Sequence, residues 1–348
     1  MNTAEATLLD TAAAHLRARD LAVVIKQARG DDDVDAWFRV TKDKKHVDYA
    51  VEVKRQVTPQ TVGAVVAQLK HRGELTKKPA LLVTAHAAPP VADRLTAANQ
   101  QFVDAAGNAY LNAPGMFLLI TGRKPEKGAE KTAETAGDVF TKPGVKTLFA
   151  LICNPELAAA TYRQVAATAN VALGALPGVL AGLQQAGHLH VMGNKRKLVT
   201  TKRLLDEWAL AYARRLRPKQ LLRTLVTPTF GKWREWDVHA DHAKWGGEPA
   251  GALLTNYLEP GVLTLYAEKL PARLLVDQRM TTARPNDAHN LVEIRKPFWG
   301  EGLENRRRAD LVPEPLVYAD LLATGDARCI EAAQMIYEEH LARLFTAT

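Results

Sequence analysis

Two acids and a lysine fall in neighbouring segments, and their types and spacing are those of a metal-dependent hydrolytic site. Asp35 opens the segment DAWFRV, and Glu52 and Lys54 end the segment VDYAVEVK. Both segments alternate apolar and polar residues, which predicts two β-strands joined by the polar run TKDKKH as a hairpin. Two carboxylates so placed repel each other unless a cation lies between them, and either Lys54 or a divalent ion such as Mg²⁺ would serve.

The alignment of the two strands follows from their side-chain pattern. Setting Arg39 opposite Asp48 makes a favourable cross-strand ion pair, and it sets Asp35 opposite Glu52. A slip of one residue would exchange the two faces of one strand, so we expect this register. The apolar pairs that it implies on the other face are Ala36 with Val51, Phe38 with Tyr49 and Val40 with Val47.

An acid on one strand and Glu-x-Lys on its hairpin partner resemble the PD-(D/E)xK restriction-endonuclease-like superfamily. The predicted α-β-β-β-α-β order of elements within residues 1–122 resembles that fold as well. The resemblance implies that Asp35 and Glu52 hold Mg²⁺ and that Lys54 positions the attacking water. A sheet edge without catalytic activity is the alternative interpretation.

The match to that superfamily departs from its pattern in one place and leaves one assignment open. Val34 stands where the family has a proline before its first acid. Asp32 and Asp33 are alternatives to the first acid, since they lie close to it in the sequence. By the same resemblance, Glu5 and Gln68 are helical accessories of the site.

Residues 162–200 predict a helix-turn-helix followed by a basic hairpin, which is the order of elements in a winged helix. The first helix, YRQVAATAN, ends at Asn170, and the second begins near Ala175 with Pro177 in its first turn. Gly187 ends that helix. Its buried stripe is Val179, Leu180 and Leu183, and two strands then flank the turn Gly193-Asn194.

A winged helix places its second helix in the major groove and the cations of its hairpin on phosphates or in the minor groove. A winged helix that contacts only protein is the alternative. We expect a basic helix to continue from residue 202 to about residue 225. The predicted DNA-contacting residues are Arg163, Gln164, Gln184, Lys195, Arg196, Lys197, Arg215 and Lys219.

The C-terminal third mixes helices with two predicted strands, VLTLYAE and NLVEIRK. The motifs YRQVA, GGEPAGALLTNYL and LVYADLLATGDARCIEAAQMIYEEHL resemble the AbiEi-type regulators over residues 145–348. These are the antitoxins of type IV toxin–antitoxin systems. The resemblance implies a repressor of its own operon that binds double-stranded DNA. It also implies a nucleotidyltransferase-like toxin, which the antitoxin need not touch.

The C-terminal fold is itself similar to nucleotidyltransferases, but their chemistry is missing. The run GGEPAG lacks the serine of their Gly-Ser turn, and VLTLYAE lacks two carboxylates one residue apart. His239, Asp241 and His242 predict an exposed polar loop, because zinc needs further converging ligands. Asp104 and Asn108 predict a tight turn.

The chain of 348 residues is thus predicted to be an α/β (α+β) multidomain protein. Residues 1–122 are a restriction-endonuclease-like mixed sheet, 123–144 a linker, 145–226 a winged helix and 227–348 a C-terminal α/β domain. The net charge of +8 favours a polyanionic partner. No apolar stretch is long enough to span a membrane, so we expect a cytoplasmic protein without a membrane partner. The sequence does not determine the oligomeric state.

The sequence therefore predicts a DNA-binding transcriptional regulator, an autorepressor that needs no cofactor to bind DNA. The alternative is a DNA endonuclease that a winged helix targets and that uses Mg²⁺ at Asp35 and Glu52. A third interpretation is a non-catalytic partner in a larger complex.

Overall fold

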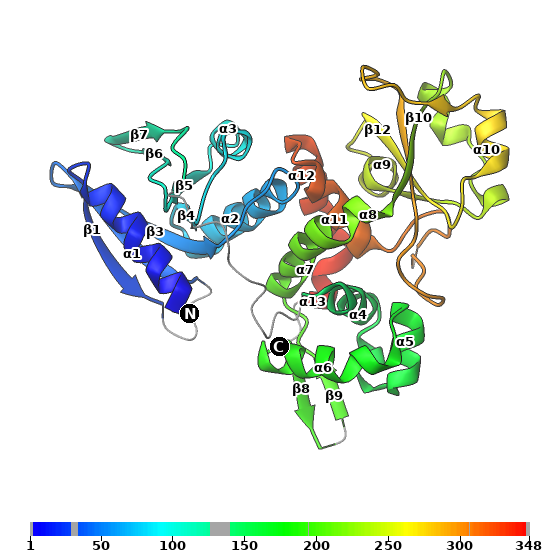
Figure 1. The fold of residues 1–348 in the computed structure, drawn as a ribbon, viewed down its shortest axis with the longest axis horizontal. Coiled ribbons are helices and arrows are strands. Elements are labelled where there is room, and N and C mark those ends of the chain that lie inside the picture. Colours follow the sequence, from blue (N-terminus) through cyan, green and yellow to red (C-terminus); the bar gives the residue numbers. More distant parts are fainter. Residues whose placement is uncertain (1–2, 29–33, 126–139, 194, 306, 346–348) are drawn as a thin grey trace. The chain divides into compact units, whose positions relative to one another are not determined.

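The computed structural model describes residues 3–28, 34–125, 140–193, 195–305 and 307–345 (Figure 1). The chain divides into two compact units, residues 1–133 and 134–348. Asp32 and Asp33, most of the predicted linker, and Asn194 of the predicted hairpin turn lie outside the described residues.

The first unit contains a mixed sheet in which the strands follow one another in the order β1-β2-β3-β4-β5-β6-β7. Strands β3, β4 and β5 are parallel neighbours, and the other neighbours are antiparallel. The predicted α-β-β-β-α-β order is present. The elements are α1 (Thr3–Arg17), β1 (Ala22–Gln27), β2 (Ala36–Lys42), β3 (Lys45–Lys54), α2 (Val62–Thr76), β4 (Ala80–Thr84), α3 (Pro89–Ala97), β5 (Gln101–Asp104), β6 (Ala109–Ala113) and β7 (Met116–Ile120).

The predicted register of the β2–β3 hairpin is confirmed at every pair that was named within the two strands. Arg39 lies opposite Asp48, and its Nε is 2.7 Å from Asp48 Oδ1. Phe38 and Tyr49 are fully buried and pack with the apolar face of α1. Because side chains alternate along a strand, Glu52 and Lys54 point to the opposite face, where α2 packs on β3 and β4.

The second unit combines helices with a five-stranded sheet of order β11-β12-β14-β10-β13 and a separate β8–β9 hairpin. Its first part comprises α4 (Lys142–Cys153), η1 (Pro155–Ala159), α5 (Tyr162–Ala169), η2 (Leu173–Ala175), α6 (Leu176–Gln185), β8 (Leu189–Met192), β9 (Lys195–Leu198), α7 (Lys202–Arg215) and α8 (Arg217–Gln220). The rest comprises β10 (Leu221–Val226), η3 (Phe230–Glu235), η4 (His239–Asp241), β11 (Lys244–Gly246), α9 (Gly247–Thr255), β12 (Val262–Tyr266), α10 (Ala272–Asp277), β13 (Thr281–Thr282), β14 (Leu291–Arg295), α11 (Glu314–Thr324), α12 (Ala327–Ile336), the π-helix η5 (Tyr337–Leu341) and α13 (Ala342–Phe345).

The two helices that the sequence predicts after residue 162 are present as α5 and α6. Asn170 ends α5 in the left-handed conformation with φ 51°, and Pro177 lies in the first turn of α6. Gly187 follows α6 with φ 75°, a conformation that favours glycine. The predicted stripe of Val179, Leu180 and Leu183 is buried. These local signals are sufficient to place both helices.

The predicted basic helix from 202 to about 225 is wrong beyond α7. The helix ends at Arg215, because Pro218 has no N–H to donate to a carbonyl one turn earlier. A short helix, α8, follows, and the run LLRTLV then forms β10, which pairs with β14. Strand β10 thus joins the C-terminal sheet, although it lies before the predicted boundary at residue 226.

A buried polar network ties α7, α8, β12 and α11 together. The carboxylate of Asp320 is fully buried and accepts hydrogen bonds from the hydroxyls of Tyr212 and Tyr266 at 2.9 and 2.8 Å. Arg217 Nε donates to the same carboxylate at 3.0 Å. Burial, and then the charge of Asp320, raise the pKa of both tyrosines well above their ordinary value, so both hydroxyls stay protonated donors.

The loop after β14 holds α5 in place. Phe298 and Trp299 pack on Phe149 of α4, with ring centroids 4.9 and 5.5 Å apart. Gly300 donates its N–H to the carbonyl of Thr168 at 2.8 Å, and a Cβ at Gly300 would overlap the carbonyl oxygen of Ala167 in α5. Glycine is therefore required here for the close approach of two backbones.

Among the described helices, none is by itself long and apolar enough to cross a membrane, although the bent pair formed by 162–169 and 173–185 passes by length and composition alone.

Candidate nucleic-acid interface

Glu52 lies in a compact ion-pair cluster on the face of the first unit that α2 covers. Its side chain is 8% exposed, and its Oε1 lies 2.8 Å from Lys54 Nζ. Its Oε2 lies 3.6 Å from Nε of Arg72, which comes from α2. Each carboxylate oxygen therefore faces a cation of the protein.

Asp35 lies immediately before β2, and its carboxylate turns onto the backbone of β3. Its N–H donates to the carbonyl of Val51 at 3.0 Å, and its Oδ2 accepts from the N–H of Val53 at 2.8 Å. Val53 is the residue between Glu52 and Lys54. The structure thus brings together the three residues that the sequence singles out.

The resemblance to nucleases implies that Asp35 and Glu52 hold Mg²⁺. Two carboxylates are a suitable number of protein ligands for this ion. As they stand, however, the oxygens of Glu52 face Lys54 and Arg72, and two cations beside a divalent ion would repel it. Among the described residues, no group of three or more His, Cys, Asp or Glu side chains is placed to hold a metal ion. The residues in this arrangement do not fit the metal.

The predicted accessories differ in their surroundings. Gln68 lies one turn before Arg72 on α2, and its Oε1 is buried with no hydrogen-bond partner among the described residues. Glu5 lies on α1, which packs on the other face of the sheet.

Asp104 forms a second buried cluster, which includes a contact with His86 that the sequence does not predict. The predicted turn is confirmed, since Asp104 Oδ1 accepts from the N–H of Asn108 at 2.7 Å. Its Oδ2 accepts from the N–H of Ala87 at 2.8 Å and lies 3.2 Å from His86 Nδ1. Strands β4 and β5 are parallel, so the residues after β4 meet the end of β5 without any signal in the local sequence.

In the second unit, the β8–β9 hairpin presents two lysines to solvent. Leu189 pairs with Leu198, and both are buried, so every second side chain points away from the core. Lys195 and Lys197 lie on that outward face and are exposed, as the sequence predicts.

Arg196 has a different position from its two neighbours. It is half-buried, its Nη2 donates to the carbonyl of Ala160 at 2.5 Å, and its Cζ lies 4.7 Å from the centroid of the Tyr162 ring. A guanidinium over an aromatic face is an attractive cation–π contact. Arg196 therefore joins the hairpin to the start of α5, a role that the sequence does not reveal.

Gln164 also has a structural role in addition to the predicted contact with DNA. Its Oε1 accepts from the N–H of Thr161 at 3.0 Å and from the hydroxyl of Thr161 at 2.8 Å. The N–H of Gln164 donates in return to the Thr161 hydroxyl, which completes a capping box at the start of α5. The signal, Thr three residues before Gln, is present in the sequence.

The other predicted contacts lie on four helices. Arg163 and Gln184 are exposed on α5 and α6, and Lys219 is exposed on α8. Arg215, the last residue of α7, is half-buried. Arg163 thus lies on α5 and Lys195 and Lys197 on the β8–β9 hairpin, whereas Arg215 and Lys219 lie at the end of α7 and on α8, shortly before β10.

No acidic residue occurs between Glu156 and Asp206. This acid-free segment (residues 157–205) contains all of α5, α6 and the β8–β9 hairpin. Its cations are Arg163, Lys195, Arg196, Lys197, Lys202 and Arg203. Lys202 and Arg203 pair with Asp206 and Glu207, which follow the segment, at 2.9 Å each. No ion pair within the described residues joins the exposed Arg163, Lys195 or Lys197 to a carboxylate, so the surface around these three residues attracts polyanions.

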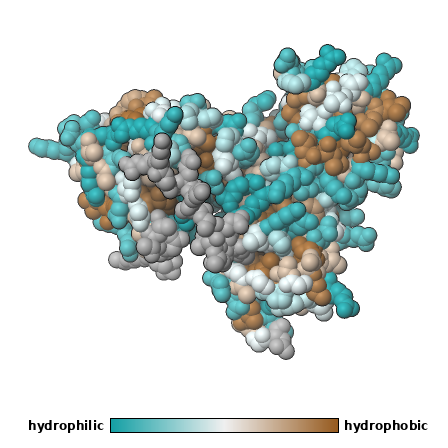
Figure 2. Space-filling view, in the orientation of Figure 1, coloured by the Kyte–Doolittle hydropathy of each residue, from teal (hydrophilic) through white to brown (hydrophobic). Residues whose placement is uncertain are grey.

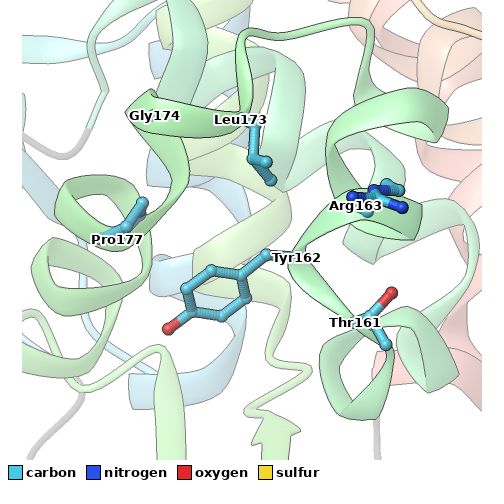
Figure 3. Close-up of a pocket in the computed structure, with 6 residues that line it drawn as sticks. All are labelled: Thr161, Tyr162, Arg163, Leu173, Gly174 and Pro177. Carbon is cyan, nitrogen blue, oxygen red and sulfur yellow. The ribbon is translucent and has the colours of Figure 1, made fainter.

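Apolar side chains also reach the surface of the acid-free segment, as the brown atoms at the tip of the β8–β9 hairpin show (Figure 2). Met192 is 72% exposed, Leu173 49% and Tyr162 41%. The last two line a groove of about 520 Å³ between the start of α5 and the start of α6, together with Thr161, Arg163, Gly174 and Pro177. In Figure 3 the Tyr162 ring extends toward Pro177 below Leu173, and Arg163 points away from it.

Replacing Arg196 with alanine is expected to loosen the hairpin from α5. The change removes a hydrogen bond from a charged donor and a cation–π contact, and together they contribute about 2 kcal/mol. Hydrogen exchange of the β9 amides should therefore accelerate, whereas Lys197→Ala, at the next position on the outward face, should leave it unchanged. Equal protection in both variants would contradict this role of Arg196.

The comparisons with known proteins concern the second unit. Neither the curated proteins nor the solved structures compared with the chain gave a match. The predicted resemblance to AbiEi regulators over residues 145–348 is confirmed for most of that range by a family model. Residues 197–342, from within β9 to the start of α13, match the family described as transcriptional regulator, AbiEi antitoxin of type IV toxin–antitoxin systems.

Proposed function

We propose that the protein is a DNA-binding transcriptional regulator of the AbiEi type, which represses its own operon. The observation that carries the proposal is the acid-free segment, whose exposed cations lie on a helix-turn-helix and on the hairpin that follows it. The family match begins inside that hairpin and continues through the C-terminal sheet. A regulator of this family requires a DNA-binding part, and the acid-free segment supplies the chemistry for one.

In this proposal the acid-free segment acts as a winged helix. Helix α6 enters the major groove, and the hairpin lies along the neighbouring backbone. Lys195 and Lys197, on the outward face, neutralise phosphates. Arg163 at the start of α5 reaches a further phosphate, and the loop at Gly300 fixes α5 against the rest of the unit.

The partners follow from the same proposal. Double-stranded DNA upstream of the reading frame is the direct partner. A nucleotidyltransferase-like toxin, encoded in the same operon, is the functional partner and need not contact the protein. No cofactor is required, because the contacts are made by charged and polar side chains.

The test is DNA binding by the full chain over a series of salt concentrations. Mobility shifts with the upstream DNA should give a log–log salt slope that falls in magnitude by about two when Lys195 and Lys197 are both replaced by alanine. Lys232→Ala with Lys269→Ala is a matched control, since both lysines are exposed, lie elsewhere in the same unit and carry the same total charge.

Two outcomes would contradict the proposal. Binding of the upstream DNA that is no tighter than binding of an unrelated duplex of equal length would remove the repressor function. Equal salt slopes for the hairpin variant and the control variant would show that the hairpin is not part of the DNA interface.

A further inference from the structure

The first turns of α6 carry no side chain that can hydrogen-bond to a base. Its exposed residues there are Pro177, Gly178 and Ala181, and only Gln184 and Gln185 at its end are polar. Sequence-specific proteins read the major groove by hydrogen bonds and by apolar contacts with base edges. If α6 faces DNA, its first turns have only the second means.

Two glycines keep this surface flat, although no contact inside the protein requires a glycine at either position. Gly174 and Gly178 have ordinary φ angles, and a Cβ added to either would meet no atom within 4 Å. Glycine in a helix destabilises it by about 1 kcal/mol relative to alanine. Neither backbone conformation nor packing inside the protein requires these glycines, and their lack of a side chain leaves this surface open to the close approach of a partner.

The groove beside these glycines is apolar and is bordered by cations. Tyr162 and Leu173 line it and are substantially exposed. Arg163 lies at its edge, and Arg196 lies over the Tyr162 ring. The complementary occupant carries negative charge and small apolar groups at close range. In the major groove of B-DNA, the C5-methyl of thymine is the apolar group, and phosphates flank it.

We propose that the groove between α5 and α6 takes thymine methyl groups, so that this protein selects A·T base pairs largely by apolar contact. The inference rests on the proposed DNA binding and names how that site discriminates. Leu173 and Pro177 contact the methyl groups, and Gly174 and Gly178 let the base edges approach. The amide of Gln184 is suited to adenine, the partner of thymine.

The first experiment removes the methyl groups and nothing else. The upstream DNA is amplified once with dTTP and once with dUTP, and the two duplexes are compared in mobility shifts with the full chain. The uracil duplex should bind more weakly by about fourfold for each methyl contacted, which corresponds to ~0.8 kcal/mol. The salt slope should be the same for both, because the number of phosphates is unchanged.

The second experiment changes the protein. In Leu173→Ala the preference for the thymine duplex should shrink. Gly178→Ala should weaken binding of the thymine duplex, while its thermal stability is equal to or above that of the wild type. Gly231→Ala is the matched control, since Gly231 is also exposed, with no atom within 4 Å of an added Cβ, and lies outside the groove.

The outcomes separate this inference from the proposed function. Specific binding with equal affinity for the thymine and uracil duplexes would overturn the inference alone. A preference for thymine that persists unchanged in Leu173→Ala would overturn it as well. Failure of either duplex to bind would overturn the proposed function and the inference together.

Discussion

Replacing Asp320 with alanine is expected to lower the free energy of unfolding of the second unit by about 3–5 kcal/mol. Its carboxylate is fully buried and accepts hydrogen bonds from Tyr212, Tyr266 and Arg217. Without it, the more distant Glu293, at 3.8 Å, is the counter-ion left to the Arg217 guanidinium within the described residues, and two buried hydroxyls lose this acceptor. Removing one member of a buried ion pair is among the most destabilising single changes.

Urea unfolding followed by tryptophan fluorescence measures this loss, because five of the six tryptophans lie in the second unit. Asp326→Ala is the control: Asp326 is exposed and caps α12 through its side chain, so its loss should reduce stability by about 1 kcal/mol. If Asp320→Ala were no more destabilising than Asp326→Ala, the network would not hold the unit together.

The Asp320 network also bears on the proposed DNA binding. Tyr212 belongs to α7, which directly follows the β8–β9 hairpin in the chain. Helix α7 packs on α11, which carries Asp320, and on α4. The part of the chain similar to AbiEi regulators contains α7 and α11. Both helices pack on α4, which in turn contacts α5 and α6 of the acid-free segment.

Local sequence patterns were sufficient for the β2–β3 register and for both helices of the helix-turn-helix. The hairpin register is determined by alternation and by one charge pair, all within residues 35–54. The ends of α5 and α6 are determined by Asn170 and Gly187, which adopt left-handed backbones. In each case the decisive interaction joins residues close in sequence.

The missed features depend on contacts between residues far apart in sequence. Arg196 turns inward because the carbonyl of Ala160 and the Tyr162 ring lie beside β9. Arg72 reaches Glu52 only because α2 crosses back over β3. The end of the helix predicted through residue 225 is an exception, because Pro218 is a local signal present in the sequence. The strand that follows it is stabilised by the distant β14. No periodicity within one segment contains this information.

The last prediction concerns Glu52, which belongs either to a catalytic site or to a stabilising ion-pair cluster in the first unit. In a catalytic site that holds carboxylates against their mutual repulsion, removal of one acid relieves strain, and stability commonly rises. In a cluster whose charges are already compensated, removal of the acid leaves cations that repel each other. Since Glu52 contacts both Lys54 and Arg72, we expect Glu52→Ala to destabilise the first unit by about 3 kcal/mol.

Hydrogen exchange of the β3 peptides measures this change, since the first unit has Trp37 as its only tryptophan. Asp48→Ala is a matched control on the same strand and face. Asp48 pairs with Arg39, which is 45% exposed, so its loss should reduce stability by less than about 1 kcal/mol. Incubation of wild-type protein and Glu52→Ala with plasmid and Mg²⁺ completes the test. Protection of β3 that is unchanged or higher in Glu52→Ala, together with plasmid cleavage by the wild type alone, would make this cluster a nuclease site. Lost protection without any cleavage would identify it as an ion-pair cluster that stabilises the mixed sheet of the first unit.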